Sequence, residues 1–395
     1  MQKFLIKSSR IYTPAGKIAG GVVVNEGKIE AIVANRDLPK YAALQVVDVG
    51  ERVVLPGFID IHIHGSAGWA AGSGEKEQIR GLNKYLPSVG VTGYQPTFGG
   101  ETVPVIKKSL TAVADVMEED YAGAKILGVH MEGPFLSRAE KGAFIVENLL
   151  QPSVELMGEF VELGRGSIIH VTVAPELEGA EELIKFLRSH DILVAGGHTD
   201  ATLTETQQGI KWGVGLSNHT GNAQRSIHHR EPGALGGYLL DEDIYCELIC
   251  DFFHIHPEMI RMILKLKTTD KICMISDAII GAGLGAGKYE FSGKTINIDD
   301  EGWSRLDDGT ISGSTKSMEF CFQNMVKLGY DVGEVSKMSS YVPAKLSKVD
   351  HRKGTIEVGK DADLIVLDEG WNVLKTYVEG KLSYDAAEAR NLANT

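Results

Sequence analysis

The chain has 395 residues, which is long enough for one large catalytic domain and a smaller partner domain. Its composition, 43% hydrophobic and 24% charged, is that of an ordinary globular protein, and its net charge of −13 argues against nucleic acid or an acidic membrane as a partner. The chain shows no secretory leader and no apolar run near the about 20 residues of a membrane span. We therefore expect a cytoplasmic protein.

The four cysteines show neither a CxxC pair nor the spacing of a zinc finger. Most of them lie in or beside apolar, strand-like segments, where free cysteine behaves as a small hydrophobic side chain. We expect all of them to be buried thiols: Cys246, Cys250, Cys273 and Cys321.

Both ends of the chain show the alternating apolar and polar pattern of short antiparallel strands. Such strands are predicted at residues 4–11, 21–24, 28–33, 355–358, 363–367 and 373–377. Each group alone is too small to fold independently. We therefore expect both ends to build one small β-sandwich domain, made of residues 1–54 and residues 350–395.

Between the two ends, apolar strand-like segments alternate with segments of helical length, such as residues 178–189 and 257–266. The strands are predicted at residues 53–63, 90–96, 126–131, 168–173, 192–195, 214–216, 247–253 and 272–275. Eight strand–helix units predict an α/β fold, a (β/α)8 TIM-like barrel over residues 55–349. A doubly wound sheet is the competing architecture, but it would disperse the polar residues described next.

Several of these strands end in side chains that bind metal ions. His62 and His64 lie two residues apart, so on a strand they point to the same side. Glu132 ends the third strand, where a carboxylate can bridge two cations, and His198 and His219 follow the fifth and sixth strands. Each residue alone is more often structural. Their shared place at the carboxyl ends of strands predicts a metal centre at the mouth of the barrel.

Asp277 follows the last predicted strand. A carboxylate beside a metal-bound water can accept its proton and later return it to a leaving group. Because a cation lowers the pKa of bound water from 15.7 to about 7, the arrangement favours hydrolysis of an amide or ester. Histidine and carboxylate ligands suit a divalent ion, zinc or iron first and manganese or cobalt next, with one or two ions left open. The glycine-rich run at residues 281–287 favours a mobile active-site loop over a phosphate-binding loop.

Seven short motifs combine these residues with their surroundings, at residues 56–65, 128–135, 174–176, 197–201, 229–233, 276–278 and 359–363. Together they resemble the amidohydrolase superfamily and, within it, the N-acetylglucosamine-6-phosphate deacetylases, over nearly the full length. The first and last motifs are shared across the superfamily. The segments at residues 128–135 and 229–233 are more specific.

The resemblance implies a role for each matching position. Glu132, His198 and His219 match metal ligands, His62 and His64 match a pair in members that bind two ions, and Asp277 matches the general acid and base. The implied substrate contacts are backbone at the phosphate from Asn222 and Ala223, cationic phosphate contacts from Arg230 and His254, and sugar and acetamide contacts from Ala143, Ile311, Ser312 and Gly313. From the residues alone, Arg230 is more simply a surface ion-pairing residue and His254 a core histidine. The family is commonly dimeric, which implies a homodimer.

Three segments depart from the family pattern, and all lie near the expected substrate. Phe144 stands where the family commonly has a histidine, and residues 219–224 and 251–254 also differ from the common sequence. None of these changes removes a predicted metal ligand or Asp277. The metal chemistry is therefore better supported than the identity of the sugar.

The leading hypothesis is a metal-dependent deacetylase that converts N-acetylglucosamine-6-phosphate to glucosamine-6-phosphate and acetate in amino-sugar catabolism. The alternatives are deacetylation of the galacto epimer, another amidohydrolase reaction on a cyclic amide, a dipeptide or an aminopurine, and a catalytically lapsed paralogue that binds a ligand. No lysine ends the fourth strand and no HxxE pair follows the fifth, which disfavours the cyclic-amidase and deaminase branches. Unused buried carboxylates and imidazoles would carry a desolvation cost in a lapsed paralogue.

Overall fold

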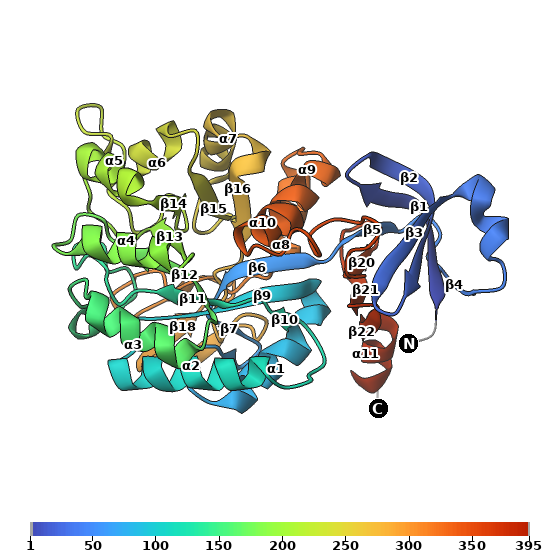
Figure 1. Cartoon of the computed structure of the whole chain (residues 1–395), viewed down its shortest axis with the longest axis horizontal. Helices are drawn as coiled ribbons and strands as arrows, with labels where there is room; N and C mark the ends of the chain where they lie inside the picture. The colour runs from blue at the N-terminus through green and yellow to red at the C-terminus, as the bar shows by residue number, and fades with distance from the viewer. Residues whose placement is uncertain (1–2, 394–395) are drawn as a thin grey trace.

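The computed structural model describes residues 3–393 and places a parallel barrel beside a smaller sheet (Figure 1). From β9 the strands pair in the order β9, β11, β12, β13, β14, β15 and β16, and both β6 and the short β10 also pair with β9. The strands are β6 (Phe58–Ile63), β9 (Val91–Phe98), β10 (Lys125–Ile126), β11 (Val129–Glu132), β12 (Ile168–Val173), β13 (Leu193–Gly196), β14 (Val214–Ser217), β15 (Tyr245–Ile249) and β16 (Ile272–Ile275). The predicted barrel is confirmed.

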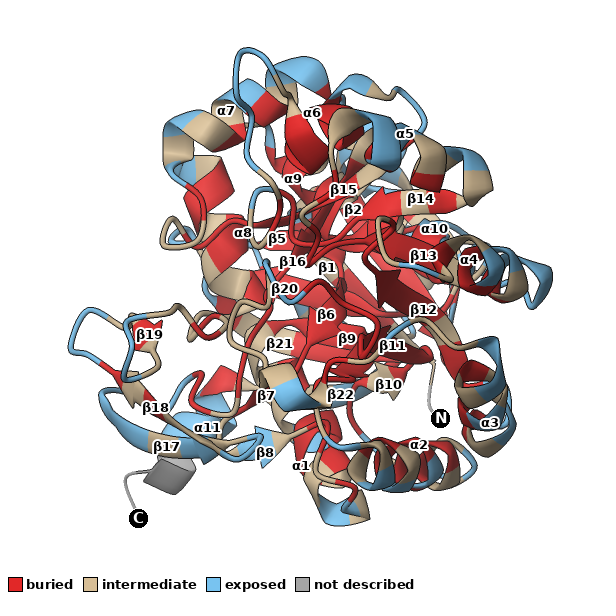
Figure 2. Ribbon diagram, turned by 90° about the vertical axis from the view of Figure 1, so that its left-hand side faces the viewer, coloured by how far each residue is buried: buried red, intermediate tan, exposed pale blue. Residues whose placement is uncertain are grey.

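The barrel closes where its last strand meets its first. The backbone N–H of Asp277, just after β16, donates to the carbonyl of His62 on β6 at 2.9 Å, and Ile63 forms a parallel bridge with Ala278. Buried residues fill the strands, and exposed residues gather on the outer helices (Figure 2). These helices are α1 (Lys76–Tyr85), α2 (Val103–Met117), α3 (Val154–Gly164), α4 (Ala180–Ser189), α5 (Leu203–Trp212), α6 (Gly233–Leu240), α7 (Pro257–Leu266), α8 (Met318–Lys327), α9 (Val332–Ser336) and α10 (Val342–Leu346).

Most predicted barrel strands shift by one or two residues, the segment at residues 126–131 forms two short strands, and two segments differ more in their bounds. The segment at residues 53–63 divides at Gly57, where a Cβ atom would lie 2.2 Å from a side-chain carbon of Thr92. Its first half, β5 (Val53–Pro56), pairs with strands of the smaller sheet instead. The segment predicted at residues 247–253 ends at Ile249, because the Asp251 carboxylate accepts hydrogen bonds from the next backbone N–H groups and forms a turn.

Strands from both ends of the chain form one hydrogen-bonded mixed sheet, with β5 between them (Figure 1). The remaining strands are β1 (Phe4–Thr13), β2 (Gly16–Asn25), β3 (Lys28–Ala34), β4 (Gln45–Asp48), β20 (Leu364–Leu367), β21 (Val373–Val378) and β22 (Lys381–Asp385), followed by α11 (Ala386–Ala393). The strand predicted at residues 355–358 does not form, and β22 was not predicted. The joint origin of this β domain is confirmed, whereas the domain limits at residues 54 and 349 stay a prediction.

A three-stranded insert follows the last barrel strand. It consists of β17 (Gly287–Phe291), β18 (Lys294–Ile298) and β19 (Ser304–Arg305), and the glycine-rich segment at residues 281–287 leads into it. The turn between β17 and β18 reaches the cavity described below, whereas none of residues 281–287 lines it, so a mobile active-site loop there stays a prediction. All four cysteines are free and buried, as predicted. Among the described residues, no helix has the length and apolar character needed to cross a membrane.

A buried ion-pair network ties the segment before β20 to the smaller sheet. Lys353 has no exposed surface, and its ammonium lies 2.6 Å from Asp363, 3.1 Å from Asp361 and 3.6 Å from Glu379. Burial lowers the pKa of Lys353, but the two aspartates outweigh burial and raise the pKa overall. The ammonium is therefore charged, and its removal would take from the buried Asp363 carboxylate its only ion-pair partner among residues 3–393, whereas Asp361 would keep Lys28 and Arg352.

We expect Lys353→Met to lower the free energy of unfolding by about 3–5 kcal/mol, the typical cost of removing one partner from a buried ion pair. Lys7→Met is the control, because the pair of Lys7 with Asp48 is exposed and should contribute at most about 1 kcal/mol. Urea unfolding of both variants measures the difference. Equal, small losses in the two variants would show that the buried network contributes no more than a surface pair.

Candidate metal centre

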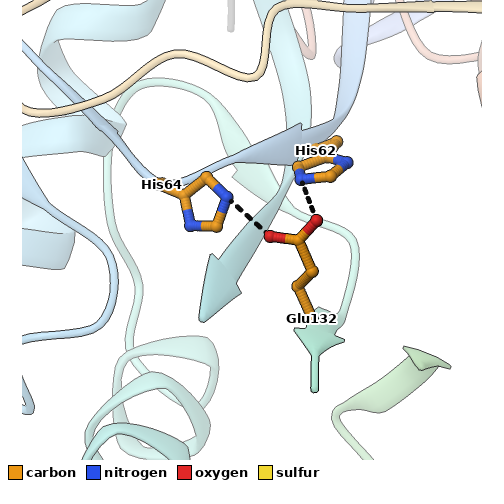
Figure 3. A group of neighbouring side chains, drawn as sticks. All are labelled: His62, His64 and Glu132. Carbon is orange, nitrogen blue, oxygen red and sulfur yellow. Dashed lines mark ion pairs between the residues drawn. The ribbon is translucent and has the colours of Figure 1, made fainter. Parts of the chain in front are cut away.

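The predicted metal ligands converge at the carboxyl ends of the barrel strands. The ligating atoms of His62, His64 and Glu132, here the first ligand group, lie within 4.8 Å of one another. The same holds for Glu132, His198 and His219, the second ligand group. Figure 3 shows the Glu132 carboxylate between the imidazoles of His62 on β6 and His64 just after it. Four strands therefore contribute to one cluster, and Glu132 is common to both groups.

Glu132 faces all four imidazoles through their Nε2 atoms. Its Oε2 lies 3.1 Å from His64, and its Oε1 lies 3.4 Å from His62, 3.3 Å from His198 and 3.0 Å from His219. Oε1 thus faces one imidazole of the first group and both of the second, and Oε2 faces His64 alone. The position of Glu132 next to both groups agrees with its expected place at the end of the third strand, and its role as a bridge between two ions stays a prediction.

The hydrogen bonds at Nδ1 of His198 and His219 place the lone pair of each ring on Nε2, and the Asn218 amide nitrogen also lies 3.0 Å from the Nε2 of His219. The Nδ1 atom of His198 lies 2.8 Å from the carbonyl of Glu140, and that of His219 lies 3.1 Å from the carbonyl of Asn222. A carbonyl only accepts, so each Nδ1 carries the hydrogen and each neutral ring has a lone pair on Nε2. These two Nε2 atoms are 3.0 Å apart. Facing lone pairs at that distance need a proton or a cation between them, so the donor set fits a metal ion.

The electrostatics of the cluster also favour positive charge. Burial lowers the pKa of His62, but Glu132, Glu247 and Asp277 outweigh burial and raise the pKa well above its ordinary value. Burial likewise opposes charge on His64, whose pKa rises to about 9 through Asp277 and Glu132. Burial raises the pKa of Glu132, yet the surrounding imidazoles hold it well below its usual range. A bound divalent cation would replace the protons on these imidazoles and balance the charge of the same carboxylates.

Three of the site residues share an uncommon backbone conformation. His198, His219 and Asp277 each lie two residues beyond the end of their strand and have positive φ angles, of 45°, 22° and 49°. For residues other than glycine this region costs about 1–3 kcal/mol each and persists mainly where the surrounding structure enforces it, often at functional sites. Two of the five predicted metal ligands, and Asp277, therefore lie in turns of this kind.

Asp277 lies beside the first ligand group. Its Oδ1 is 3.4 Å from the Nε2 atoms of both His62 and His64, and its backbone carbonyl accepts a hydrogen bond from Ser314 at 2.8 Å. Burial raises the pKa of Asp277, but His62 and His64 outweigh it and lower the pKa overall. Asp277 is thus an ionised carboxylate that can accept a proton next to the cluster.

A cavity of about 360 Å³ opens over the cluster. Most of the predicted site residues line it: His64, Glu132, Ala143, His198, His219, Asn222, Ala223, His254, Asp277, Ile311, Ser312 and Gly313. His62 is fully buried beneath it. Arg230 does not line it, because this residue is exposed on the loop before α6 and its guanidinium lies 2.6 Å from the His229 ring.

His254 presents a ring nitrogen to the cavity. Its Nδ1 donates to Asp251 at 2.8 Å, and its buried Nε2 has no hydrogen-bond partner among the described residues. Burial lowers the pKa of His254, but the bond to Asp251 outweighs burial and raises the pKa. A charged imidazole with a free N–H donor suits an anionic group of a ligand. The core-histidine interpretation does not explain that free donor.

Sequence reasoning missed cavity residues such as Lys294 and Gly100, although it placed Phe144 near the substrate. Lys294 comes from the insert, which no motif indicated, and its pKa falls to about 8 through burial and then Lys141. Phe144, the departure noted above, packs edge-on against the His198 ring with centroids 4.8 Å apart. Gly100 makes room for it, since a Cβ there would lie 2.0 Å from the phenyl ring. This wall of the cavity is therefore apolar.

Comparison with known families supports the interpretation of the site. The amidohydrolase family matches residues 53–383, and the composite domain of allantoinase matches residues 1–52. The N-acetylglucosamine-6-phosphate deacetylase of Bacillus subtilis (strain 168) is 32% identical over 393 residues, covering 98% of this chain and 99% of that protein.

Solved structures agree with this family relationship. The N-acetylglucosamine-6-phosphate deacetylase of Pasteurella multocida superposes with a TM-score of 0.90 at 31% identity, covering 96% of this chain and 99% of that one. A mutant of the Mycobacterium smegmatis enzyme, in complex with N-acetyl-D-glucosamine-6-phosphate, superposes with a TM-score of 0.91 at 25% identity, covering 97% of this chain and 100% of that one.

Proposed function

The chain belongs to the amidohydrolase family and, within it, to the N-acetylglucosamine-6-phosphate deacetylases, and we propose that it converts N-acetylglucosamine-6-phosphate to glucosamine-6-phosphate and acetate in amino-sugar catabolism. One observation carries the proposal: a single cavity brings together the metal-ligand cluster, the Asp277 carboxylate and the free donor of His254. The first two suit amide hydrolysis, and the third suits a phosphate. The expected cytoplasmic location stays a prediction.

The metal ligands in this proposal are Glu132, His198 and His219 for one ion, with His62, His64 and the shared Glu132 for a second. When bound, a divalent cation would polarise the acetamide carbonyl and acidify water, a role that zinc or iron fills with such ligands. The protein contributes the orientation of the ligands. Carbonyl groups hold the Nδ1 atoms of His198 and His219, so that their Nε2 atoms point to the cluster.

Asp277 is the proposed proton carrier. Its carboxylate would accept the proton of the attacking water and donate it to the amine nitrogen as the bond to the acetyl carbon breaks. The carboxylate is buried and borders the cavity, so a substrate amide there excludes the solvent that would otherwise exchange this proton. The lowered pKa agrees with the unprotonated form needed for the first step.

The proposed phosphate contacts divide between two chains. His254 and the backbone of Asn222 and Ala223 line the cavity and would contact the phosphate within one chain. Arg230 lies outside the cavity of its own chain, so a phosphate contact from its guanidinium requires a second copy in a homodimer. Ala143 and residues 311–313 would line the sugar and the acetamide.

Acetate release from a panel of N-acetylated hexosamines tests this proposal. The panel contains the gluco and galacto epimers, each with and without a 6-phosphate, together with elemental analysis of the purified protein. We expect acetate and amino sugar in equal amounts from the phosphorylated gluco substrate. Ring opening of a cyclic amide or ammonia release without acetate would favour another amidohydrolase reaction. Stoichiometric metal without any turnover would favour the lapsed paralogue.

Replacement of His254 by Gln should affect phosphorylated substrates selectively. A charge-assisted hydrogen bond contributes about 1.5–3 kcal/mol, so kcat/KM for the 6-phosphate should fall by about 10- to 100-fold. Because the pKa of His254 is raised, the wild-type contact should persist above the ordinary pKa of about 6.5 and weaken only at higher pH. Steady-state kinetics with phosphorylated and unphosphorylated substrates measure the selectivity. An equal loss on both substrates would rule out the phosphate contact.

A further inference from the structure

One buried carboxylate has no role in the chemistry described above. Glu247 lies on β15, points into the barrel and has no exposed surface. Its Oε2 is 3.0 Å from the Nδ1 of His62 and accepts a hydrogen bond from the backbone N–H of His219 at 2.9 Å. A single oxygen atom therefore contacts one residue from each ligand group.

The contact with Glu247 determines which nitrogen of His62 is free. A carboxylate accepts, so the Nδ1 of His62 carries the hydrogen and the Nε2 of the neutral ring has the lone pair. That Nε2 lies 3.4 Å from both Glu132 and Asp277 and has no hydrogen bond within residues 3–393. The unbonded nitrogen points into the cluster, in the orientation that a metal ligand needs.

The orienting group of His62 differs from those of the second ligand group. Backbone carbonyls hold the rings of His198 and His219, whereas an ionisable side chain holds His62. A carboxylate partner makes an imidazole a stronger ligand than a neutral carbonyl does, and such partners typically change metal affinity by about 10- to 100-fold. The orientation of His62, in the first ligand group, therefore involves the charged side chain of Glu247, which is not itself a ligand.

A purely structural role does not account for Glu247. Within the described part of the chain, its only ion-pair partner is His62, and its Oε1 has no hydrogen bond. A buried, half-satisfied carboxylate is costly, and an apolar residue of similar size would usually fill such a place in a barrel core at lower cost. The desolvation cost of the Glu247 carboxylate has a reason if its charge orients the neighbouring ligand His62.

We propose that Glu247 is a positioning residue that holds His62 in its metal-binding tautomer and joins the two ligand groups through the backbone of His219. The inference rests on the proposed metal centre but not on the identity of the substrate. The informative variant is Glu247→Gln, because a glutamine carbonyl can still accept from His219 while the negative charge beside His62 is lost.

Competition between the full-length protein and a chelator for Zn²⁺ tests the proposal. We expect Glu247→Gln to weaken the binding of one Zn²⁺ by about 10- to 100-fold. The same change in a His62→Gln background should alter affinity by less than about twofold, because a residue that acts through His62 has no further effect once His62 is absent. Asn324→Ala is the control, since it removes a buried hydrogen bond to the carbonyl of Cys250 without touching a ligand.

The results separate this inference from the proposed function. Unchanged Zn²⁺ affinity in Glu247→Gln, an equal loss in the His62→Gln background, or an equal loss in Asn324→Ala would each overturn the positioning role. Thermal unfolding of the metal-free variants shows whether a loss of affinity follows from a loss of folding, which would also overturn it. The Glu247→Gln change could lower Zn²⁺ affinity only when His62 is present, while the protein releases no acetate. That result would support the positioning role and reject the deacetylase instead.

Discussion

The Asp277→Asn variant is expected to lose about 10²–10⁴-fold in kcat, the usual contribution of a general acid and base, while keeping nearly all of its metal. Asparagine has almost the same volume but cannot accept a proton from water or return one to the departing amine. The backbone hydrogen bonds of Asp277 to His62 and Ser314, which help to close the barrel, remain in the variant. The metal ligands therefore keep their support.

Acetate release and elemental analysis of the same preparation measure both effects. A variant with near-normal kcat would show that another group carries the proton. A variant that loses metal together with activity would assign Asp277 to metal retention, since the Asp277 Oδ1 also lies near His62 and His64.

Glu132→Gln should weaken metal binding at both sites, unlike Asp277→Asn, because Glu132 is the one residue common to both ligand groups. The amide removes the negative charge that faces four imidazoles, so we expect both Zn²⁺ affinities to fall by more than the about 10- to 100-fold that an orienting partner contributes. Activity should fall with the bound metal. Chelator competition and acetate release measure the two losses.

His62→Gln is the matched control for Glu132→Gln. It removes a ligand from the first group only, so the ion bound by Glu132, His198 and His219 should remain. Full metal content in Glu132→Gln would contradict the shared-ligand geometry. Equal losses in the two variants would show that the groups are not separate sites.

Sequence patterns predicted the barrel well because its strands are local, continuous apolar segments. The predicted bounds of β12 and α7 agree with the structure at both ends. The predicted strand bounds were wrong where contacts between distant parts of the chain determine them. The break at Gly57 depends on the side chain of Thr92 on a neighbouring strand, and the pairing of β5 with both ends of the chain depends on the assembly of the second sheet.

The candidate metal centre could be predicted for a similar reason. Residues at the carboxyl ends of parallel strands meet at one end of a barrel, so position along the chain was sufficient to group Glu132 with the histidines. Glu247 could not be found in this way, since it lies within an apolar strand and contacts a residue 185 positions away. The place of Arg230 outside the cavity likewise depends on how its loop folds.

The central claim is that side chains from separate strands hold a divalent cation at the mouth of the barrel. Anomalous X-ray diffraction at the zinc edge, from crystals of the zinc-loaded protein, tests it most directly. We predict an anomalous peak about 2.0–2.2 Å from Glu132 and from the Nε2 atoms of His198 and His219. Zinc that binds only elsewhere on the protein, or no peak at these ligands in fully loaded crystals, would contradict the account.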